Sequence, residues 1–236
     1  MNIIMSEREN ILGRIREALK VPAPRPKSHT RIADDPTTSP AAEDTPQTAR
    51  EWLPFVGASA EERLALFAKN AASLKADFQL LASRDELKAA LLKLRDGEKW
   101  QRVASHGGEL TDFACQTLGL PVTLTDRGYD VNEMEKCDAG ITECDLLVAQ
   151  TGGVAVTSRS TGGRALTVLP PHHVVIARRD QLVADLPAAF AFLQQKYAPN
   201  FPSMISFITG PSRTGDIERI LVLGAHGPKK LTILCV

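Results

Sequence analysis

The chain lacks an excess of either charge and a long hydrophobic run. It has 28 basic and 28 acidic side chains among 236 residues, whereas nucleic-acid-binding proteins need a basic excess to displace counterions. No apolar run approaches the ~20 residues that span a bilayer, and the short apolar start, residues 1–5, turns charged at once. These absences predict a cytoplasmic protein with no nucleic-acid partner, no transmembrane segment and no signal peptide.

Clustered metal ligands and nucleotide signatures are also missing. None of the four cysteines belongs to a C-x-x-C motif, and no Cys/His set has the spacing of a zinc or iron–sulfur site. There is neither a G-x-G-x-x-G nor a G-x-x-x-x-G-K-[ST] segment. The sequence therefore predicts that this chain holds no metal or cofactor. The four cysteines are predicted to be reduced thiols: Cys115, Cys137, Cys144 and Cys235.

The composition is that of a globular protein, with 43% hydrophobic and 24% charged residues, which excludes disorder throughout. Residues 1–20 contain a capping-box pattern and an apolar stripe at helical spacing, so they predict a short amphipathic helix. Residues 21–58 hold seven of the fifteen prolines and predict an arm or linker. Residues 59–236 form the predicted main domain.

The first half of the main domain alternates helical and strand-like segments. Ser59 with Glu62, and Ser83 with Glu86, have capping-box spacing and predict two helices. Such an alternation favours an α/β domain with a mainly parallel sheet. A segment at 109–118 is predicted to be helical. Three further segments are predicted to be strands: 78–81, 102–105 and 122–124.

The second half of the domain runs from strand to strand. After a strand at 146–149, three apolar segments rich in β-formers predict antiparallel additions to the same sheet: 154–157, 165–169 and 174–177. A helix over 180–197 and a strand over 205–208 come next. The chain then continues with a short helix after Asp216, an apolar segment at 220–223 and a last strand at 231–236.

Two glycine pairs are candidate binding turns. Thr151, Gly152 and Gly153 directly follow the strand at 146–149, and their amides could bind an anion. A tight hairpin turn explains the same glycines equally well. A second pair, Gly162 and Gly163, favours a hairpin turn, although the guanidinium of Arg164 could complete an anion pocket.

The main candidate site is the loop from Thr209 to Glu218, which follows a strand and is predicted to lead into a helix. In an open α/β sheet, ligands bind beyond the carboxyl ends of the strands. Ser212 and Thr214 offer hydroxyl groups, and Arg213 offers a guanidinium fork for a carboxylate or phosphate. We therefore predict that this loop binds a small anion.

A serine-hydrolase reading of the same loop is less favoured. Ser212, Asp216 and His226 follow the chain order of an α/β-hydrolase triad, but Thr214 stands where the nucleophile elbow needs a glycine. Asp216 is also too close in sequence to Ser212 to orient the histidine from a strand of its own. A binding site is the favoured interpretation of this loop.

Two histidine segments are open to more than one reading. His226 is either a surface residue of a Gly-Pro turn or a neutral imidazole near the Ser212 loop. His172 and His173 are adjacent on a predicted strand, so they point to opposite faces and make a poor metal pair. One of them, which we take to be His173, could still face the pocket.

Several motifs that follow one another along the chain resemble those of the lactate-utilisation protein C family, whose core is the LUD domain. The resemblance covers most of the chain, including the helix near the N-terminus, and is strongest over 138–236. Gly153 stands where many members have a second threonine. The motifs are Gly140-Ile141-Thr142-x-x-Asp145, Thr151-Gly152-Gly153-Val154, Gly163-Arg164…Leu169-Pro170-x-His172-His173, Gly210-Pro211-Ser212-x-Thr214-x-Asp216-Ile217-Glu218 and Gly224-x-His226-Gly227-Pro228.

The resemblance implies a three-layer α/β/α sandwich with a mainly parallel sheet plus antiparallel strands, similar to the sugar-phosphate isomerase, CoA-transferase and formyltetrahydrofolate cyclo-ligase group. It implies an accessory subunit in the oxidation of L-lactate to pyruvate, with iron–sulfur clusters in partner subunits. It transfers no catalytic residue. The expected ligand pocket comprises Thr151, Gly152, Gly153, Arg164, His173, Ser212, Arg213, Thr214 and His226.

Two other functions remain open. One is a stand-alone enzyme of the same fold group that acts on a phosphorylated or acyl substrate through Ser212, Arg213 or His226. The other is an assembly module that docks through residues 6–20 and the proline-rich arm.

Overall fold

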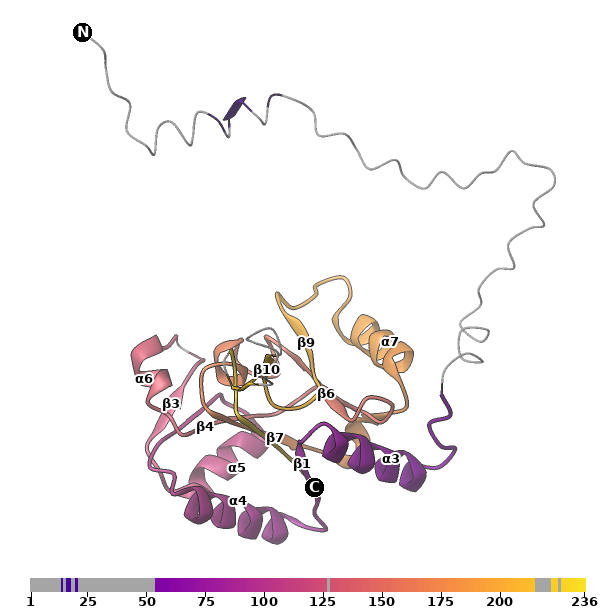
Figure 1. Ribbon diagram of the computed structural model, residues 1–236, viewed down its shortest axis with the longest axis horizontal. Helices are drawn as coiled ribbons and strands as arrows, with labels where there is room; N and C mark the ends of the chain where they lie inside the picture. The colour runs from indigo at the N-terminus through magenta and orange to yellow at the C-terminus, as the bar shows by residue number, and fades with distance from the viewer. Residues whose placement is uncertain are drawn as a thin grey trace, which may run out of the picture. The chain divides into compact units, whose positions relative to one another are not determined.

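The computed structural model describes residues 54–126, 128–214, 222–224 and 226–236, together with positions 14, 16, 17 and 20. The chain divides into two units, Met1–Leu53 and Pro54–Val236, and the architecture below is that of the second unit (Figure 1). The predicted helix within 1–20, most of the proline-rich arm and the predicted helix after Asp216 lie outside the described residues.

Six strands form a wholly parallel sheet in the order β1-β12-β7-β4-β2-β3. The fold is therefore α/β. One of these strands, β4, had no counterpart among the predicted strands. The six strands are β1 (Asp77–Leu80), β2 (Val103–Ser105), β3 (Val122–Leu124), β4 (Ala139–Thr142), β7 (His172–Ala177) and β12 (Lys230–Cys235).

The antiparallel direction predicted for 174–177 is wrong. This segment lies in β7, which pairs in parallel with β12 on one side and with β4 on the other. All six residues of β7 are buried, as is typical of a strand in the middle of a parallel sheet. A run that is buried on both faces has no alternation of polar and apolar residues from which its direction could be inferred.

Helices α3 (Ala60–Ser73) and α4 (Arg84–Glu98) begin where the capping boxes predict. The Ser59 hydroxyl accepts a hydrogen bond from the Glu62 amide, and Ser83 caps α4 through the Glu86 amide in the same way. Helix α5 (Glu109–Leu118) matches its prediction, and the short α6 (Val131–Glu135) was not predicted.

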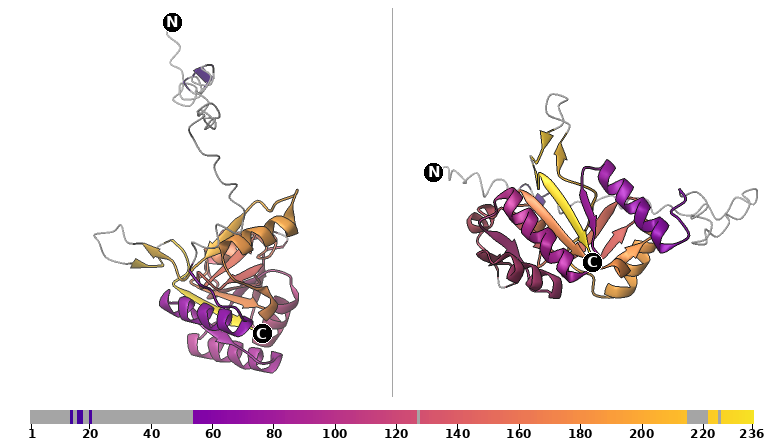
Figure 2. Two further views of the ribbon diagram at one scale, coloured as in Figure 1. Left: turned by 90° about the vertical axis from the view of Figure 1, so that its right-hand side faces the viewer. Right: turned by 90° about the horizontal axis from the view of Figure 1, so that it is seen from below.

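The parallel sheet has a core on each face. Helices α4 and α5 cover one face, where Leu87 and Leu91 are fully buried and each contributes about 1.5–3 kcal/mol of burial free energy. Helix α3 packs on the other face through Phe67 and Ala71. Seen from below, β12 and β7 lie between α4 and α3 (Figure 2).

A second, four-stranded sheet has the order β8-β5-β6-β9. β5 (Leu146–Val148) and β6 (Gly153–Thr157) are antiparallel neighbours, β9 (Ile205–Ile208) is antiparallel to β6, and β8 (Leu182–Val183) is parallel to β5. The strand predicted at 154–157 is thus antiparallel, but together with the strand predicted at 205–208 it builds this separate sheet instead of extending the parallel one.

Two segments depart from the predicted secondary structure. The strand predicted over 165–169 is wrong, because Ala165–Thr167 forms a 3-10 helix whose Leu166 carbonyl lies against the Cα of Gly140 in β4. The helix predicted over 180–197 begins later, since Asp185 caps α7 (Leu186–Tyr197) and a 3-10 turn at Arg179–Gln181 and strand β8 precede it. Helix α7 packs on the second sheet through Ala189, Leu193 and Tyr197.

A short antiparallel hairpin, β10 (Arg213–Thr214) with β11 (Val222–Leu223), completes the unit. Among the helices of the described residues, none combines the length and the apolar character that a membrane crossing requires.

Candidate functional site

The predicted binding loop lies at the C-terminal end of α3. Arg213 Nη2 donates a hydrogen bond of 2.6 Å to the carbonyl oxygen of Leu74, the residue that ends this helix. Gly210 has a φ of +127°, and a Cβ there would lie 2.6 Å from the same oxygen. The loop therefore needs glycine at 210 to approach the helix end so closely.

The binding prediction assumed that this loop lies at the carboxyl ends of parallel strands, and its observed position is different. Strand β9, which precedes the loop, belongs to the small mixed sheet and pairs there in antiparallel with β6, so the rule for the carboxyl ends of parallel strands does not apply to it. The loop instead reaches the amino ends of β7 and β12, where the Ser212 amide donates to the Pro228 carbonyl at 2.9 Å, two residues before β12 begins.

The Ser212 loop and the loop that carries His226 lie side by side. The Gly224 amide donates to the Ser212 carbonyl at 2.9 Å, and a Cβ on Gly227 would lie 3.1 Å from the Ser212 Cβ. His226 is exposed on this second loop. Within the described residues no hydrogen bond joins Ser212 to His226, and Asp216, the third member of the hydrolase reading, lies outside them.

The same loops contact the start of β7. The Lys229 amide donates to the Pro171 carbonyl at 2.7 Å, which places the neighbouring His172 beside them. His172 is 5% exposed, its Nε2 lies 2.9 Å from the Thr232 hydroxyl, and its ring meets Trp100 edge-on. Burial lowers the pKa of His172 to about 4, so the ring is neutral at pH 7.

A cleft of about 450 Å³ opens at these amino ends, and we call it the basic cleft. Four of its lining residues are cationic and two are acidic, so it favours an anion. Lys230 is held by Glu98 at 2.6 Å, whereas no ion pair within the described residues involves Lys75 or Lys229. The lining residues are Lys75, Asp77, Leu94, Glu98, His172, Pro211, Arg213, Lys229, Lys230, Leu231 and Thr232.

Of the predicted site residues, Arg213 lines the basic cleft, and His173 and Arg164 do not. His173 points to the opposite face of β7, where its Nε2 lies 2.9 Å from the Thr142 hydroxyl and burial lowers its pKa to about 3. Arg164 is exposed on a turn whose Gly162 packs against Thr125 and His106. The side chain of Thr214 lies outside the described part of the chain.

Thr151, Gly152 and Gly153 form a hairpin turn, which is one of the two interpretations of these residues. Val148 pairs with Gly153 across the turn. Gly152 has a φ of +65°, and a Cβ there would overlap the amide nitrogen of Ala71 in α3. A Cβ on Gly153 would lie 2.8 Å from the Ile208 carbonyl oxygen. Both glycines are therefore required by close packing.

The sequence prediction missed a polar cluster at the carboxyl ends of the parallel strands. His106, Gly107 and Gly108 connect β2 directly to α5, which is the placement in which a glycine pair favours anion binding. A carboxylate of the chain itself occupies this position: Glu143 accepts a 2.9 Å hydrogen bond from the Leu110 amide. The signal that could have found it is the glycine pair between a buried strand and a helix.

This cluster continues as a chain of ion pairs. Glu109 pairs with both Arg84 and Arg178, at 2.7 Å for Arg178, and Arg178 lies 3.5 Å from Glu143. The His106 Nε2 accepts a hydrogen bond from the Glu143 amide at 3.1 Å. The polar groups of this cluster thus satisfy one another.

The described residues include no group of three or more His, Cys, Asp or Glu side chains that could hold a metal ion. All four cysteines are free, and burial raises the pKa of each thiol, that of Cys235 to about 11. These thiols are therefore protonated at neutral pH and poor nucleophiles.

Comparison with known proteins gives consistent results. Lactate utilization protein C of Geobacillus thermodenitrificans is 26% identical over 228 residues, covering 87% of this chain and 91% of that protein. The protein of the same name from Shouchella clausii is 30% identical, covering 76% and 81%. The crystal structure of a DUF162 family protein from Deinococcus radiodurans has a similar fold, with a TM-score of 0.57, 22% identity and coverage of 76% of this chain and 99% of that one. Residues 64–236 match the LUD domain, and the chain therefore belongs to the LUD-domain family, among relatives named lactate utilization protein C.

Proposed function

We propose that the chain acts in lactate utilisation, as an accessory subunit of a cytoplasmic assembly that oxidises L-lactate to pyruvate. The observation that carries this proposal is the family relationship, because relatives with that name align over as much as 87% of the chain. In this proposal the iron–sulfur clusters that move electrons belong to partner subunits, and this chain holds none.

The basic cleft is the proposed ligand site. Lactate and pyruvate are small monocarboxylates, and a carboxylate between cationic side chains forms short, charge-assisted hydrogen bonds. Arg213 is already held in place by the Leu74 carbonyl, and Lys75 and Lys229 line the same cleft. Their positive charges support a ligand with one or two negative charges.

A finer assignment of the fold is part of the proposal. A parallel sheet with helices on both faces supports kinship with the group of sugar-phosphate isomerases, CoA-transferases and formyltetrahydrofolate cyclo-ligases. If the chain were a stand-alone enzyme of that group, the same cleft would hold a phosphate or an acyl carboxylate. That alternative differs from the preferred one in a measurable way, since it requires turnover by the isolated chain.

Calorimetry with the full chain tests the ligand site. Pyruvate, L-lactate and inorganic phosphate are titrated into the wild type, into Lys229→Gln and into Lys88→Gln, a control that removes an exposed lysine of α4 away from the cleft. We expect Lys229→Gln to weaken binding of the preferred anion by about tenfold, with no change in Lys88→Gln. Equal affinities in all three proteins would contradict the assignment.

Affinity purification from native cells tests the role in an assembly. We expect the chain to bring down partner subunits that contain iron and acid-labile sulfide, and to be inactive on lactate by itself. Recovery of the chain without such partners, together with turnover of a phosphorylated or acyl substrate by the purified chain, would support the stand-alone enzyme instead.

A further inference from the structure

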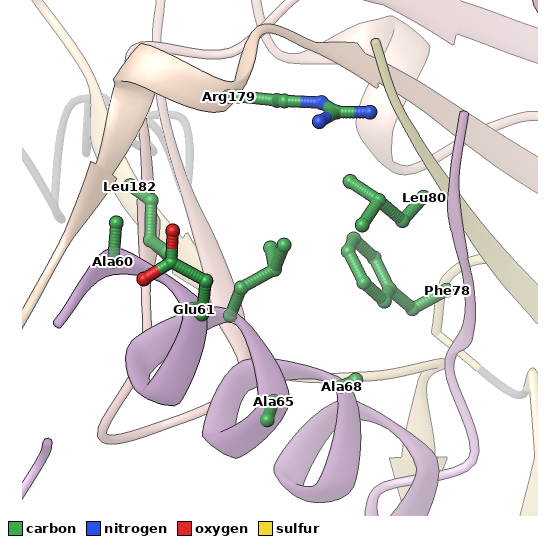
Figure 3. Close-up of a pocket in the computed structure, with 9 residues that line it drawn as sticks. Ala60, Glu61, Ala65, Ala68, Phe78, Leu80, Arg179 and Leu182 are labelled. Atoms are coloured by element: carbon green, nitrogen blue, oxygen red, sulfur yellow. The ribbon is translucent and has the colours of Figure 1, made fainter. Parts of the chain in front are cut away.

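A second cavity lies at the opposite end of the parallel sheet from the basic cleft. It has a volume of about 650 Å³ and lies between the first half of α3, the edge strand β1 and strand β8. Figure 3 shows α3 along one side and Phe78 and Leu80 of β1 on the other. Its walls are mostly apolar, with Leu64, Ala65, Ala68, Phe78, Leu80 and Leu182 as the main contributors.

The position of this cavity agrees with where open α/β sheets bind ligands. Leu80 is the last residue of β1, and Arg179 follows two residues after the end of β7, so the cavity lies beside the carboxyl ends of these parallel strands. Its volume falls within the range of ordinary small-molecule sites, which are mainly apolar with a few polar groups. Leu80 is 43% exposed, so a ligand would cover apolar surface that now faces water.

Arg179 supplies the polar group. Its guanidinium extends across the cavity next to Leu80 (Figure 3), and its Nη2 donates to the Leu81 carbonyl at 2.7 Å. A guanidinium has five N–H donors, and no ion pair involves Arg179 within the described residues. Arg179 also borders a smaller hollow of about 400 Å³ that Arg84 and Arg178 line.

The charges around the cavity orient an amphipathic anion. Arg84 and Arg178 are paired with Glu109, and Asp180 also lines the smaller hollow. Arg179 is the one cation among the described residues that line the apolar cavity itself. Glu61, in the first turn of α3, is the acidic residue of the cavity wall. It repels an anionic group from the α3 side and so favours placing that group on Arg179.

We propose that this cavity binds a single-chain amphipathic anion of the fatty-acid class. The hydrocarbon chain packs against Leu64, Phe78 and Leu182, and the carboxylate binds the guanidinium of Arg179. This inference goes beyond the proposed function. Because the cavity and the basic cleft share no lining residue, a failure of either proposal leaves the other standing.

Calorimetry of the full chain with saturated fatty acids from butyrate to decanoate tests the proposal below their micelle concentrations. We expect affinity to rise about fourfold with each added CH2 group, until the cavity is filled, and 1-decanol to bind about tenfold more weakly than decanoate because it lacks the carboxylate. The absence of saturable decanoate binding, or equal affinities for decanoate and 1-decanol, would overturn the proposal.

Three variants locate the site. Ala65 and Ala72 are both exposed alanines of α3, and Ala65 is the one that lines the cavity. We expect Ala65→Phe to weaken decanoate binding by about tenfold or more, and Ala72→Phe to bind as the wild type does. Arg179→Gln should lose decanoate affinity but keep that for 1-decanol. Equal loss in both alanine variants would overturn the location of the site.

Discussion

Arg213 and Leu74, 139 residues apart in the chain, are joined by a hydrogen bond of 2.6 Å from the guanidinium Nη2 to the carbonyl oxygen. Leu74 ends α3, and the last carbonyls of a helix have no partner within the helix itself. Arg213 therefore satisfies a helix end and at the same time contributes a positive charge to the basic cleft. Its two roles predict two separable effects of mutation.

Arg213→Ala should lower the free energy of unfolding by about 1 kcal/mol, since one hydrogen bond at an exposed position is lost, and should weaken anion binding by about tenfold. Urea denaturation and calorimetry measure the two effects. Lys229→Ala is the matched comparison, because Lys229 lines the same cleft without a side-chain hydrogen bond among the described residues. It should weaken binding and leave stability unchanged. Unaltered anion affinity in Arg213→Ala would exclude Arg213 from the site.

Gly152→Ala should destabilise the chain by about 3 kcal/mol or more. The residue has a φ of +65°, and an added Cβ would overlap the backbone nitrogen of Ala71, so both strain and a clash with α3 follow. Gly97→Ala is the control. Gly97 lies in α4, and a Cβ there meets nothing within 4 Å, so the same substitution should stabilise by about 0.5–1 kcal/mol. Thermal and urea denaturation would show opposite signs for the two variants.

Local signals in the sequence predicted much of the fold, whereas contacts between distant segments could not be predicted. The serines that cap α3 and α4 act on amides three residues away, so their pattern is visible in one short window. Whether a buried strand joins the parallel sheet or the small mixed one depends on its neighbours. Val154 and Val174 look alike in sequence, yet they pair with strands of different sheets.

The same limit applies to the candidate site. Adjacent histidines on a strand must point to opposite faces, and the sequence did not show which face would be open. His172 lines the basic cleft, and His173 is buried against Thr142. The Ser212 loop lies beside the loop that carries His226, and His226 itself is exposed. Lys75 and Lys229 were missed because only the packing of α3 and β12 brings them beside Arg213.

Asp145→Asn should lower the free energy of unfolding by about 2–4 kcal/mol. Asp145 is 1% exposed, and its Oδ1 accepts hydrogen bonds from Lys196 Nζ at 2.7 Å and from the Tyr197 hydroxyl at 2.5 Å. Burial acts to raise the pKa of Asp145, but the bonds from Lys196 and Tyr197 outweigh it and hold the pKa below its usual value. Asparagine keeps the shape of the side chain but loses the charge, so both charge-assisted hydrogen bonds to Oδ1 are weakened.

Urea denaturation measures this effect, with Lys196→Met as the comparison. The Lys196 side chain is 45% exposed, so Asp145→Asn leaves a cation that water can still reach. Lys196→Met instead leaves the buried Asp145 charge with only its bond from Tyr197, and we expect it to cost at least as much as Asp145→Asn. Wild-type stability of either variant would show that the pair is not a structural anchor between the start of β5 and α7.

Stability should fall as the pH is lowered through the range in which unfolded histidines titrate. Burial lowers the pKa of His172 to about 4 and that of His173 to about 3, whereas a histidine in the unfolded chain has a pKa of ~6.5. Between these values the unfolded state binds protons that the folded state does not. The free energy of unfolding therefore decreases as the pH falls from about 6.5 towards 4, with a slope of up to about 1.4 kcal/mol per pH unit for each histidine.

Urea denaturation at several pH values tests this prediction. His172→Gln should make the slope shallower. Leu193→Ala, which removes a buried apolar side chain of α7, is the control and should lower stability equally at every pH. An unchanged slope in His172→Gln would mean that His172 has the same pKa in the folded and unfolded chains, so that below a pH of ~6.5 it would add a positive charge to the basic cleft.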